Sequence, residues 1–230
     1  GATLAGRTSG QSWRDANVRF EGPAVASAQQ AFAENWQEAG GALLPRSAFP
    51  TLEPRGEARA ALVTSTGAVL SRAERLMQLT FSAAKKRLWI ANPYFVPSRG
   101  IVEILCRKAR AGVDVRVLVP STKSDSKTAF LMQRKDQREM LRCGVRILEY
   151  QPSMMHAKTV LVDDALSVVG SINLEPLSLG TLEEASLVIE DADFARSLEC
   201  ALVSDFGRAR ELRKTRRLRE VVLSLLGRSS

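Results

Sequence analysis

Short apolar runs alternate with segments of helical periodicity from about residue 60 onward, and this alternation limits the possible folds more than any other feature. Strands are predicted at 60–65, 87–92, 113–120 and 145–150, and helices at 71–86, 99–112 and 124–143. Strands separated by helices of this length are typical of βαβ units and of sheets covered by helices. The expected fold class is therefore an α/β sandwich, with a mixed, mainly parallel sheet flanked by helices. After Tyr150 the strand-like runs 156–162, 166–172 and 184–190 follow one another closely, and a closing helix is predicted from residue 191.

The first 60 residues follow a different pattern. Residues 24–39 have helical spacing and end at Gly40 and Gly41, and three prolines then fall within residues 45–54. We therefore expect a first unit over 1–45, a linker over 46–59 and a main unit over 60–230. A strand-turn-helix pattern that starts at Asp15 resembles one that starts at Glu184, which suggests an internal repeat.

Charge and cysteine content narrow the classes of function. Thirty-three Lys and Arg against 25 Asp and Glu give a net charge of +8, which favours anionic partners: nucleic acid, acidic lipid headgroups or phosphorylated substrates. The three cysteines include no C-x-x-C pair, so we expect neither a disulfide framework nor a zinc cluster. This pattern fits a reducing compartment best. No apolar stretch approaches the roughly 18 to 20 residues needed to cross a bilayer.

The single histidine of the chain, His156, precedes Lys158 by two residues on a predicted strand. Alternate side chains of a strand share a face, so the imidazole and the ammonium should point the same way. A turn at Asp163 and Asp164 would fold a hairpin that pairs residue 162 with 166, 160 with 168 and 156 with 172. The end of the second strand then returns to the histidine and brings three small or polar residues beside it, Gly170, Ser171 and Asn173.

This set of side chains suits a phosphodiester. Lys158, the Ser171 hydroxyl and the Asn173 amide can donate to the non-bridging oxygens, and an imidazole can attack phosphorus or transfer a proton. With one histidine and no neighbouring cysteine, a His-based metal site is not expected, and neither is any other cofactor. Gly170 would leave room for a ligand or for another backbone to approach.

His156-x-Lys158, Asp163, Gly170-Ser171-x-Asn173 and Glu184 together resemble the HKD motif of the phospholipase D superfamily. The resemblance implies that two such motifs meet in one active site, where one histidine forms a phosphohistidine and the other serves as acid and base. It makes His156 the second-motif histidine, usually the acid and base, and gives phosphate binding to Lys158, Ser171 and Asn173. Asp163 would brace the hairpin, and Glu184 would orient an active-site imidazole.

Several longer stretches resemble bacterial cardiolipin synthases along nearly all of the chain, among them 13–25, 90–105, 109–125, 141–150 and 154–180. This implies transfer of a phosphatidyl group to the hydroxyl of another phospholipid, with phosphatidylglycerol as the usual substrate and glycerol as product. Glu175 and Leu182 depart from the pattern of the family, which puts the acceptor preference in question. Two alternatives stay open: a phosphodiesterase acting on lipid or nucleic acid, and a non-catalytic anion-binding module.

If Asp15 is the first-half counterpart of Glu184, the matching histidine would lie 28 residues earlier (184 − 156 = 28), before residue 1. We therefore expect residues 1–45 to be the tail of a first half, with Asp15 deprived of its partners. The first HKD motif would come from upstream sequence or from a second subunit, and this chain alone would be inactive without it.

Other features have two interpretations each. Tyr94 and Phe95, after a predicted strand, would flank a substrate channel or pack their own loop, and Asp125 lies in a predicted solvated loop. The basic segment 208–228 suits a helix on an anionic membrane surface or an ordinary amphipathic helix. The resemblance to lipid enzymes places the protein peripherally on the cytoplasmic side of a bacterial membrane, with no nucleic acid partner favoured.

Overall fold

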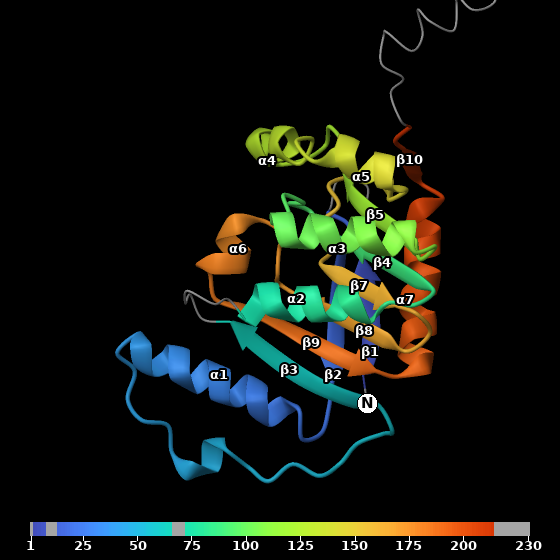
Figure 1. The fold of residues 1–230 in the computed structure, drawn as a ribbon. Coiled ribbons are helices and arrows are strands. Elements are labelled where there is room, and N and C mark those ends of the chain that lie inside the picture. The colour runs from blue at the N-terminus through green and yellow to red at the C-terminus, as the bar shows by residue number, and fades with distance from the viewer. Residues whose placement is uncertain (1, 8–12, 66–71, 214–230) are drawn as a thin grey trace, which may run out of the picture.

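The computed structural model describes residues 2–7, 13–65 and 72–213, and most of them surround an eight-stranded sheet (Figure 1). The strands run in the order β10-β6-β5-β4-β7-β8-β9-β3. Their bounds are β3 (Arg59–Ser65), β4 (Arg87–Ala91), β5 (Asp114–Pro120), β6 (Arg146–Tyr150), β7 (Thr159–Val162), β8 (Leu166–Gly170), β9 (Glu184–Glu190) and β10 (Ala209–Glu211).

The predicted α/β sandwich with a mixed sheet is present, but the prediction of a mainly parallel sheet is wrong. Only β4, β5 and β6 run parallel among the described strands, and the remaining neighbouring pairs are antiparallel. The reason lies after Tyr150, where closely spaced strands form hairpins instead of helical crossovers. Hairpins reverse the chain, and helical crossovers keep its direction.

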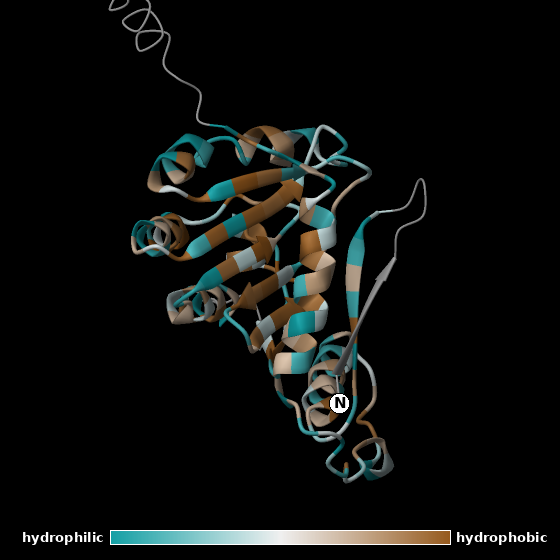
Figure 2. Ribbon diagram, turned by 90° about the vertical axis from the view of Figure 1, so that its right-hand side faces the viewer, coloured by the Kyte–Doolittle hydropathy of each residue, from teal (hydrophilic) through white to brown (hydrophobic). Residues whose placement is uncertain are grey.

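Helices cover both faces of the sheet in unequal numbers. Helices α2 (Arg72–Ala83), α3 (Arg99–Arg110), α5 (Gln137–Cys143) and α6 (Pro176–Gly180) contribute to the core on one face, and α7 (Ala192–Phe206) lies on the other. Figure 2 shows these layers edge-on, with α7 and the N-terminal segment on the same face of the sheet. The segment predicted as one helix over 124–143 forms two, because a turn over 133–136 separates α4 (Lys127–Met132) from α5.

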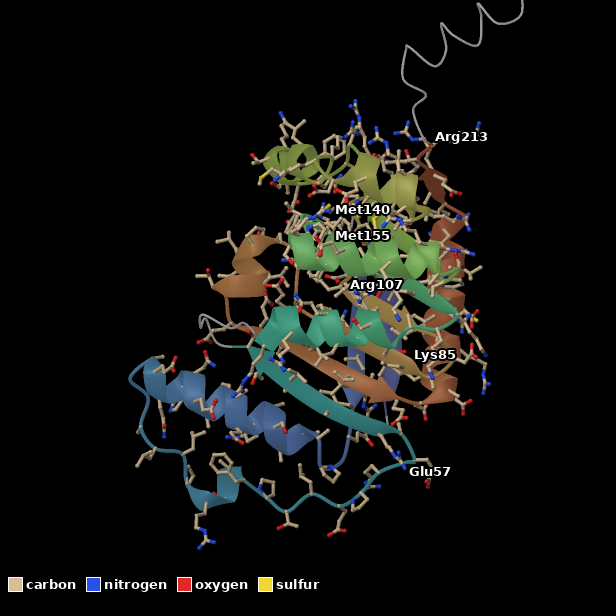
Figure 3. The ribbon with its side chains drawn as sticks, viewed as in Figure 1. Glu57, Lys85, Arg107, Met140, Met155 and Arg213 are labelled. Carbon is tan, nitrogen blue, oxygen red and sulfur yellow. A yellow bond between two sulfur atoms is a disulfide. The ribbon has the colours of Figure 1, made fainter. Side chains whose placement is uncertain are left out.

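The two cores follow from the alternation of side chains along the strands. In β4, Leu88 and Ile90 join the core under α2 and α3, whereas Trp89 and Ala91 join the core under α7. Charged side chains such as Lys85, Arg107 and Arg213 lie at the surface, and Met140 and Met155 are fully buried (Figure 3).

Cys106 and Cys143 form a disulfide, although the cysteine pattern predicts no disulfide framework. Cys106 lies on α3 and Cys143 at the end of α5, and their Cα atoms are 5.1 Å apart. Helices α3 and α5 share one face of the sheet, which brings together two residues 37 positions apart in the sequence. Cys200 on α7 is exposed and free.

The first 58 residues form a small layer of their own. Strands β1 (Ala2–Arg7) and β2 (Asp15–Phe20) pair as an antiparallel hairpin, followed by α1 (Val25–Glu38), where a helix is predicted, and a short 3₁₀ helix, η1 (Arg46–Ala48). Residues 49–58 connect to β3 without regular helix or strand, and the division into two units and a linker stays a prediction. Val18 and Phe20 of β2 pack against a buried cluster that contains Phe194 of α7.

The C-terminal segment is described in part. Ala209–Glu211 form β10 on the edge of the sheet, where a helix is predicted, and residues 214–230, with most of the predicted membrane-surface helix, lie outside the described residues. Among the helices that the structure describes, none combines the length and the apolar character needed to span a bilayer.

Candidate active site

Apart from Asp163, the predicted site residues around His156 come together at one end of the sheet, where the parallel strands β4, β5 and β6 finish. Strand β7 runs antiparallel to β4, so its first residue, Thr159, pairs with the last residue of β4, Ala91. The His156 and Lys158 segment therefore lies at the carboxyl ends of the parallel strands, where open α/β sheets place ligands. The buried Asn92 side chain donates to Ile172 O at 3.1 Å and accepts from Leu174 N at 3.0 Å, and so holds the loop that carries Asn173.

His156 is held by residues from the N-terminal segment. Its backbone N–H donates to Arg14 O at 2.7 Å, and its Nδ1 lies 3.1 Å from Oδ2 of Asp15. The Trp13 ring lies 4.6 Å from the imidazole, centroid to centroid. The expectation that Asp15 is deprived of its partners is therefore wrong: its carboxylate contacts the only imidazole in the chain. An Nδ1–H donated to this carboxylate leaves Nε2 as the acceptor of the ring.

Lys158 points to the same side as His156, as the strand alternation predicts. Its Nζ lies 2.8 Å from both ring nitrogens and donates to His156 O at 2.7 Å. Burial lowers the pKa of the Lys158 ammonium to about 8, although the negative charges of Asp15, Glu184 and Asp125 oppose part of that drop. The ammonium is thus a cation that titrates close to neutral pH.

Ser171 and Asn173 follow β8 on the same side of the sheet. The backbone N–H of Gly170 donates to Lys158 O at 3.2 Å, which brings the end of β8 back to the histidine segment. The Ser171 hydroxyl donates to Glu184 and accepts from Ala185 N at 3.0 Å. The Asn173 side-chain oxygen is buried without a hydrogen-bond partner among the described residues, so this amide retains unused bonding capacity.

Gly170 is required by a close approach of backbone. A Cβ at this position would lie 2.3 Å from Ala185 O and 2.5 Å from Ser186 Cα. The neighbour is β9, whose Ser186 pairs with Gly170. Gly170 was predicted to leave room for a ligand or for another backbone, and in the structure another backbone, that of β9, fills this space.

Glu184 is a buried carboxylate bonded to hydroxyl groups. Its two oxygens accept from Ser171 and from Ser178, the latter at 2.5 Å. No hydrogen bond joins Glu184 to His156 in the part of the chain that the structure describes. The proposed orientation of an imidazole by Glu184 therefore does not concern His156.

Asp163 lies at the turn between β7 and β8, away from the imidazole, in the left-handed region with φ 50°. Its carboxylate accepts backbone N–H bonds from Lys85, Lys86 and Arg87 at 2.7 to 3.2 Å. Burial works to raise the pKa of Asp163, but these donors outweigh it, and the pKa lies below its usual value. The carboxylate thus ties the hairpin to the start of β4.

Tyr94 and Asp125 form a hydrogen-bonded pair close to His156. The Tyr94 hydroxyl donates to the Asp125 carboxylate at 2.8 Å, and its ring lies 6.3 Å from the imidazole of His156. Burial, and next the hydrogen bond to Asp125, raise the pKa of Tyr94 to about 12, so the phenol stays a donor at neutral pH. Phe95 is buried in the core.

Trp13, Arg14 and Asp125 belong to the site although the sequence does not predict them there. The first two are direct neighbours of Asp15, and that adjacency was the available signal. The position of Asp125 after a predicted strand was a signal, but a solvated loop was expected there, since its partner Tyr94 lies 31 residues away in the sequence. Within the described residues, no cluster of three or more His, Cys, Asp or Glu could hold a metal ion.

Comparison with known proteins gives one family model and a set of relatives. The model described as cardiolipin synthase, PLD-like domain, matches residues 78–205. Cardiolipin synthase A of Pseudomonas putida is 34% identical over 223 residues, which cover 95% of this chain and 46% of that protein. Cardiolipin synthase A of Pseudomonas entomophila (strain L48) is 36% identical over 214 residues, with 91% and 44% covered. The chain therefore spans slightly less than half the length of these relatives.

Two solved structures share the fold. Nuc, a phospholipase D family member from Salmonella typhimurium, has a TM-score of 0.58 at 18% identity, covering 68% of this chain and 99% of that one. Phosphatidylserine synthase of Haemophilus influenzae has a TM-score of 0.59 at 17% identity, covering 78% and 48%. At these identities the likeness concerns the fold.

Proposed function

The chain belongs to the cardiolipin synthase, phospholipase D-like family, and from that premise we propose that the protein is a phosphatidyltransferase. It moves a phosphatidyl group from one phospholipid to the hydroxyl of another, with phosphatidylglycerol as donor and acceptor. Relatives named cardiolipin synthase A support the substrate class.

The observation that carries the proposal is the position of His156 between a carboxylate and an ammonium. Asp15 lies at Nδ1, and Lys158 lies beside both ring nitrogens. A carboxylate at Nδ1 fixes the ring and stabilises its positive charge, which suits an imidazole that takes up and releases a proton at Nε2. Lys158 provides the positive charge that a phosphodiester requires.

The reaction proceeds in two displacements. A histidine nitrogen attacks phosphorus, the bond to the leaving alcohol oxygen breaks, and His156 gives a proton to that oxygen, so that glycerol leaves. His156, now neutral, takes the proton from the acceptor hydroxyl, whose oxygen attacks phosphorus and displaces the first histidine. Lys158 and the side-chain N–H groups of Asn173 donate to the non-bridging oxygens, and Ser171 joins them once its hydroxyl turns from Glu184 to the phosphate.

His156 is the only histidine among these 230 residues, so the attacking imidazole comes from further sequence of the protein or from a second copy of the chain. We assign it to further sequence, in keeping with relatives about twice as long. The exposed aromatic residues of α1, Phe32 (55% exposed) and Trp36 (43%), support a further layer of protein against this helix. Glu184 would orient the incoming imidazole.

The protein collects its lipid at the surface of an anionic bilayer. The net charge of +8 favours such a surface. We assign the protein to the cytoplasmic face of a bacterial membrane, where it binds peripherally.

Incubation of the full protein with phosphatidylglycerol, followed by lipid analysis, tests the proposal. Diphosphatidylglycerol with an equal amount of glycerol is expected. Phosphatidic acid instead would indicate a hydrolase, and binding to vesicles without turnover would indicate an anion-binding module. Either result would overturn the proposal, provided that the protein is folded by circular dichroism.

A further inference from the structure

We propose that Arg14 is a positioning residue, whose buried ion pair with Asp205 on α7 sets the contact between Asp15 and His156. The inference rests on the proposed function for the role of the imidazole. Neither Arg14 nor Asp205 belongs to the HKD motif.

The backbone of Arg14 bonds to both sides of His156. Its N–H donates to Met154 O at 2.7 Å, and its carbonyl accepts from His156 N at 2.7 Å and from Ala157 N at 3.1 Å. The residue that follows it, Asp15, contacts the imidazole, and the residue that precedes it, Trp13, lies against the ring. A displacement of Arg14 would therefore move the carboxylate and the histidine relative to each other.

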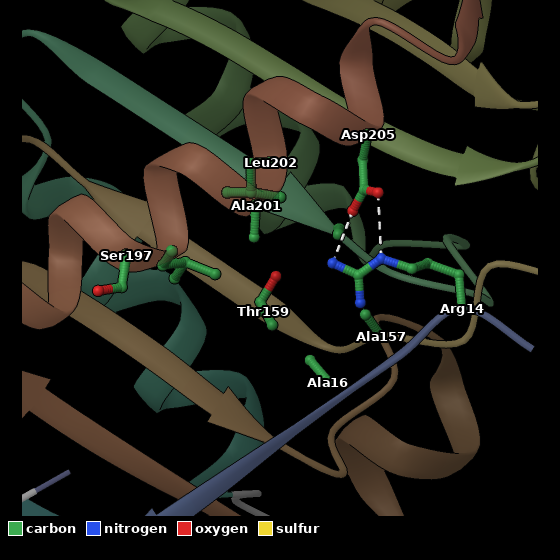
Figure 4. A pocket seen from close by; sticks show the side chains of 10 residues that line it. Arg14, Ala16, Ala157, Thr159, Ser197, Ala201, Leu202 and Asp205 are labelled. Carbon is green, nitrogen blue, oxygen red and sulfur yellow. Dashed lines mark hydrogen bonds and ion pairs between the residues drawn. The ribbon is translucent and has the colours of Figure 1, made fainter. Parts of the chain in front are cut away.

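The side chain of Arg14 fixes this backbone to α7. Figure 4 shows the guanidinium facing the Asp205 carboxylate in two parallel contacts, Nε to Oδ1 at 3.0 Å and Nη2 to Oδ2 at 2.9 Å. A third contact runs from Nη1 to the carbonyl of Asp15. Both side chains are buried, with 9% and 3% of their surface exposed, and this bidentate geometry is specific to arginine.

Packing alone does not fix the segment. A cavity of about 180 Å³ adjoins the ion pair and is lined mainly by small side chains, including Ala16, Ala157 and Ala201 (Figure 4). The hydroxyl of Thr159, which also lines the cavity, has no hydrogen-bond partner among the described residues. Close packing normally determines the position of a strand. Here the cavity lies between Ala16 of β2 and Ala157, so the ion pair beside it contributes to holding the two segments in place.

Arg208 provides a matched control. It donates to the same oxygen, Asp205 Oδ1, at 2.9 Å, but its side chain is 42% exposed and it lies directly beyond the end of α7. Arg208→Ala therefore removes one arginine from Asp205 and leaves the Arg14 backbone contacts to the histidine segment in place.

The first experiment is a kinetic double-mutant cycle in the full protein. We expect Arg14→Lys and Asp205→Asn each to lower kcat by about 10- to 100-fold, with KM changed less than 3-fold, because a small misplacement of catalytic groups has this cost. Arg208→Ala should change kcat less than 2-fold. In an Asp15→Asn background, Arg14→Lys should have almost no further effect, since it acts through Asp15. If the losses of kcat caused by Asp15→Asn and by Arg14→Lys multiply in the double variant, the proposal is wrong.

The second experiment needs no turnover. His156 is the only histidine in the chain, so ¹⁵N-histidine labelling of these 230 residues reports its tautomer without overlap. We expect the Nδ1–H tautomer in the unaltered chain and in Arg208→Ala, and a shift toward Nε2–H in Arg14→Lys and Asp205→Asn. An unchanged tautomer in a folded Arg14→Lys chain would overturn the positioning role. Lack of turnover in the unaltered full protein would count against the proposed function alone.

Discussion

Asp15 and His156, 141 residues apart in the chain, lie with Oδ2 and Nδ1 3.1 Å from each other. The carboxylate lies on β2, and the imidazole lies just before β7. The orientation of the histidine therefore depends on a residue near the start of the described chain.

Asp15→Asn should lower kcat by about 10² to 10⁴-fold, because an amide cannot stabilise a charged imidazole and permits the wrong tautomer. The measurement is diphosphatidylglycerol formation at saturating substrate. Asp193→Asn on exposed α7 surface is the control and should stay within 2-fold. Equal activity of Asp15→Asn and the unaltered protein would exclude a catalytic contribution of the contact.

Lys158 should produce an alkaline limb in the pH profile. The pKa of its ammonium is lowered to about 8, so the fraction that carries the positive charge falls as pH rises through about 8. We expect kcat/KM, which reports the free enzyme, to fall with it. Lys158→Arg should shift this limb upward by more than one pH unit, at a lower maximum. If kcat/KM of Lys158→Arg falls at the same pH as in the unaltered protein, another group causes the alkaline limb.

His156→Ala should lower turnover of phosphatidylglycerol by at least about 10²-fold, since the leaving alcohol then lacks its proton donor. A phosphatidyl ester of p-nitrophenol needs no such donor. With that substrate the variant should still release a burst of one p-nitrophenolate per site, measured by stopped-flow absorbance. Absence of the burst in a folded variant would make His156 the nucleophile instead of the acid.

Asp163→Asn should destabilise the protein by about 1 to 3 kcal/mol, because one amide oxygen replaces a carboxylate that accepts three backbone donors. Asparagine tolerates the left-handed backbone, so strain does not contribute. The lowered pKa of Asp163 means that its contribution is present above the unfolded value of 3.8 and lost as pH falls through the folded value. The difference between variant and unaltered protein in urea unfolding should therefore shrink below about pH 4.

Asp164→Asn is the control for this measurement. Asp164 lies next to Asp163 but pairs with Lys86 at the surface, where ion pairs contribute little. We expect a much smaller change than that of Asp163→Asn. Equal losses in the two variants would contradict a bracing role that is specific to Asp163.

Gly170→Ala should separate β8 from β9 and displace Ser171. The added methyl group would meet backbone atoms of Ala185 and Ser186, which cannot move away as a flexible side chain can. We expect a lower melting temperature and a loss of activity together. Gly180→Ala, where the methyl group meets nothing within 4 Å, should leave both unchanged.

Local sequence predicted the hairpin but not the sheet around it. The pairing of 160 with 168 and of 162 with 166 is present as predicted, because a turn at Asp163 and a two-residue period determine the register locally. Strand direction depends on how distant segments pack, and that information is absent from periodicity. The Cys106–Cys143 disulfide was missed for the same reason, since helix α3 meets helix α5 only in the folded protein.

The site shows the same limit. His156, Lys158, Ser171 and Asn173 were predicted because they belong to one hairpin, and the structure places them at one end of the sheet. The partner of Asp15 depends on a contact between segments 141 residues apart in the sequence. The repeat indicated that Asp15 matters, but it could not indicate that this residue contacts His156.

The hydroxyl bonds of Glu184 bear on how such a protein can evolve. Each of its oxygens accepts from one serine, and a carboxylate oxygen has two lone pairs, so both retain room for another donor. If Asp15 serves the imidazole of the main unit and Glu184 serves one from elsewhere, each unit lends the other an essential group. A change in one unit would then impair the site of the other, so the two sequences would have to evolve together.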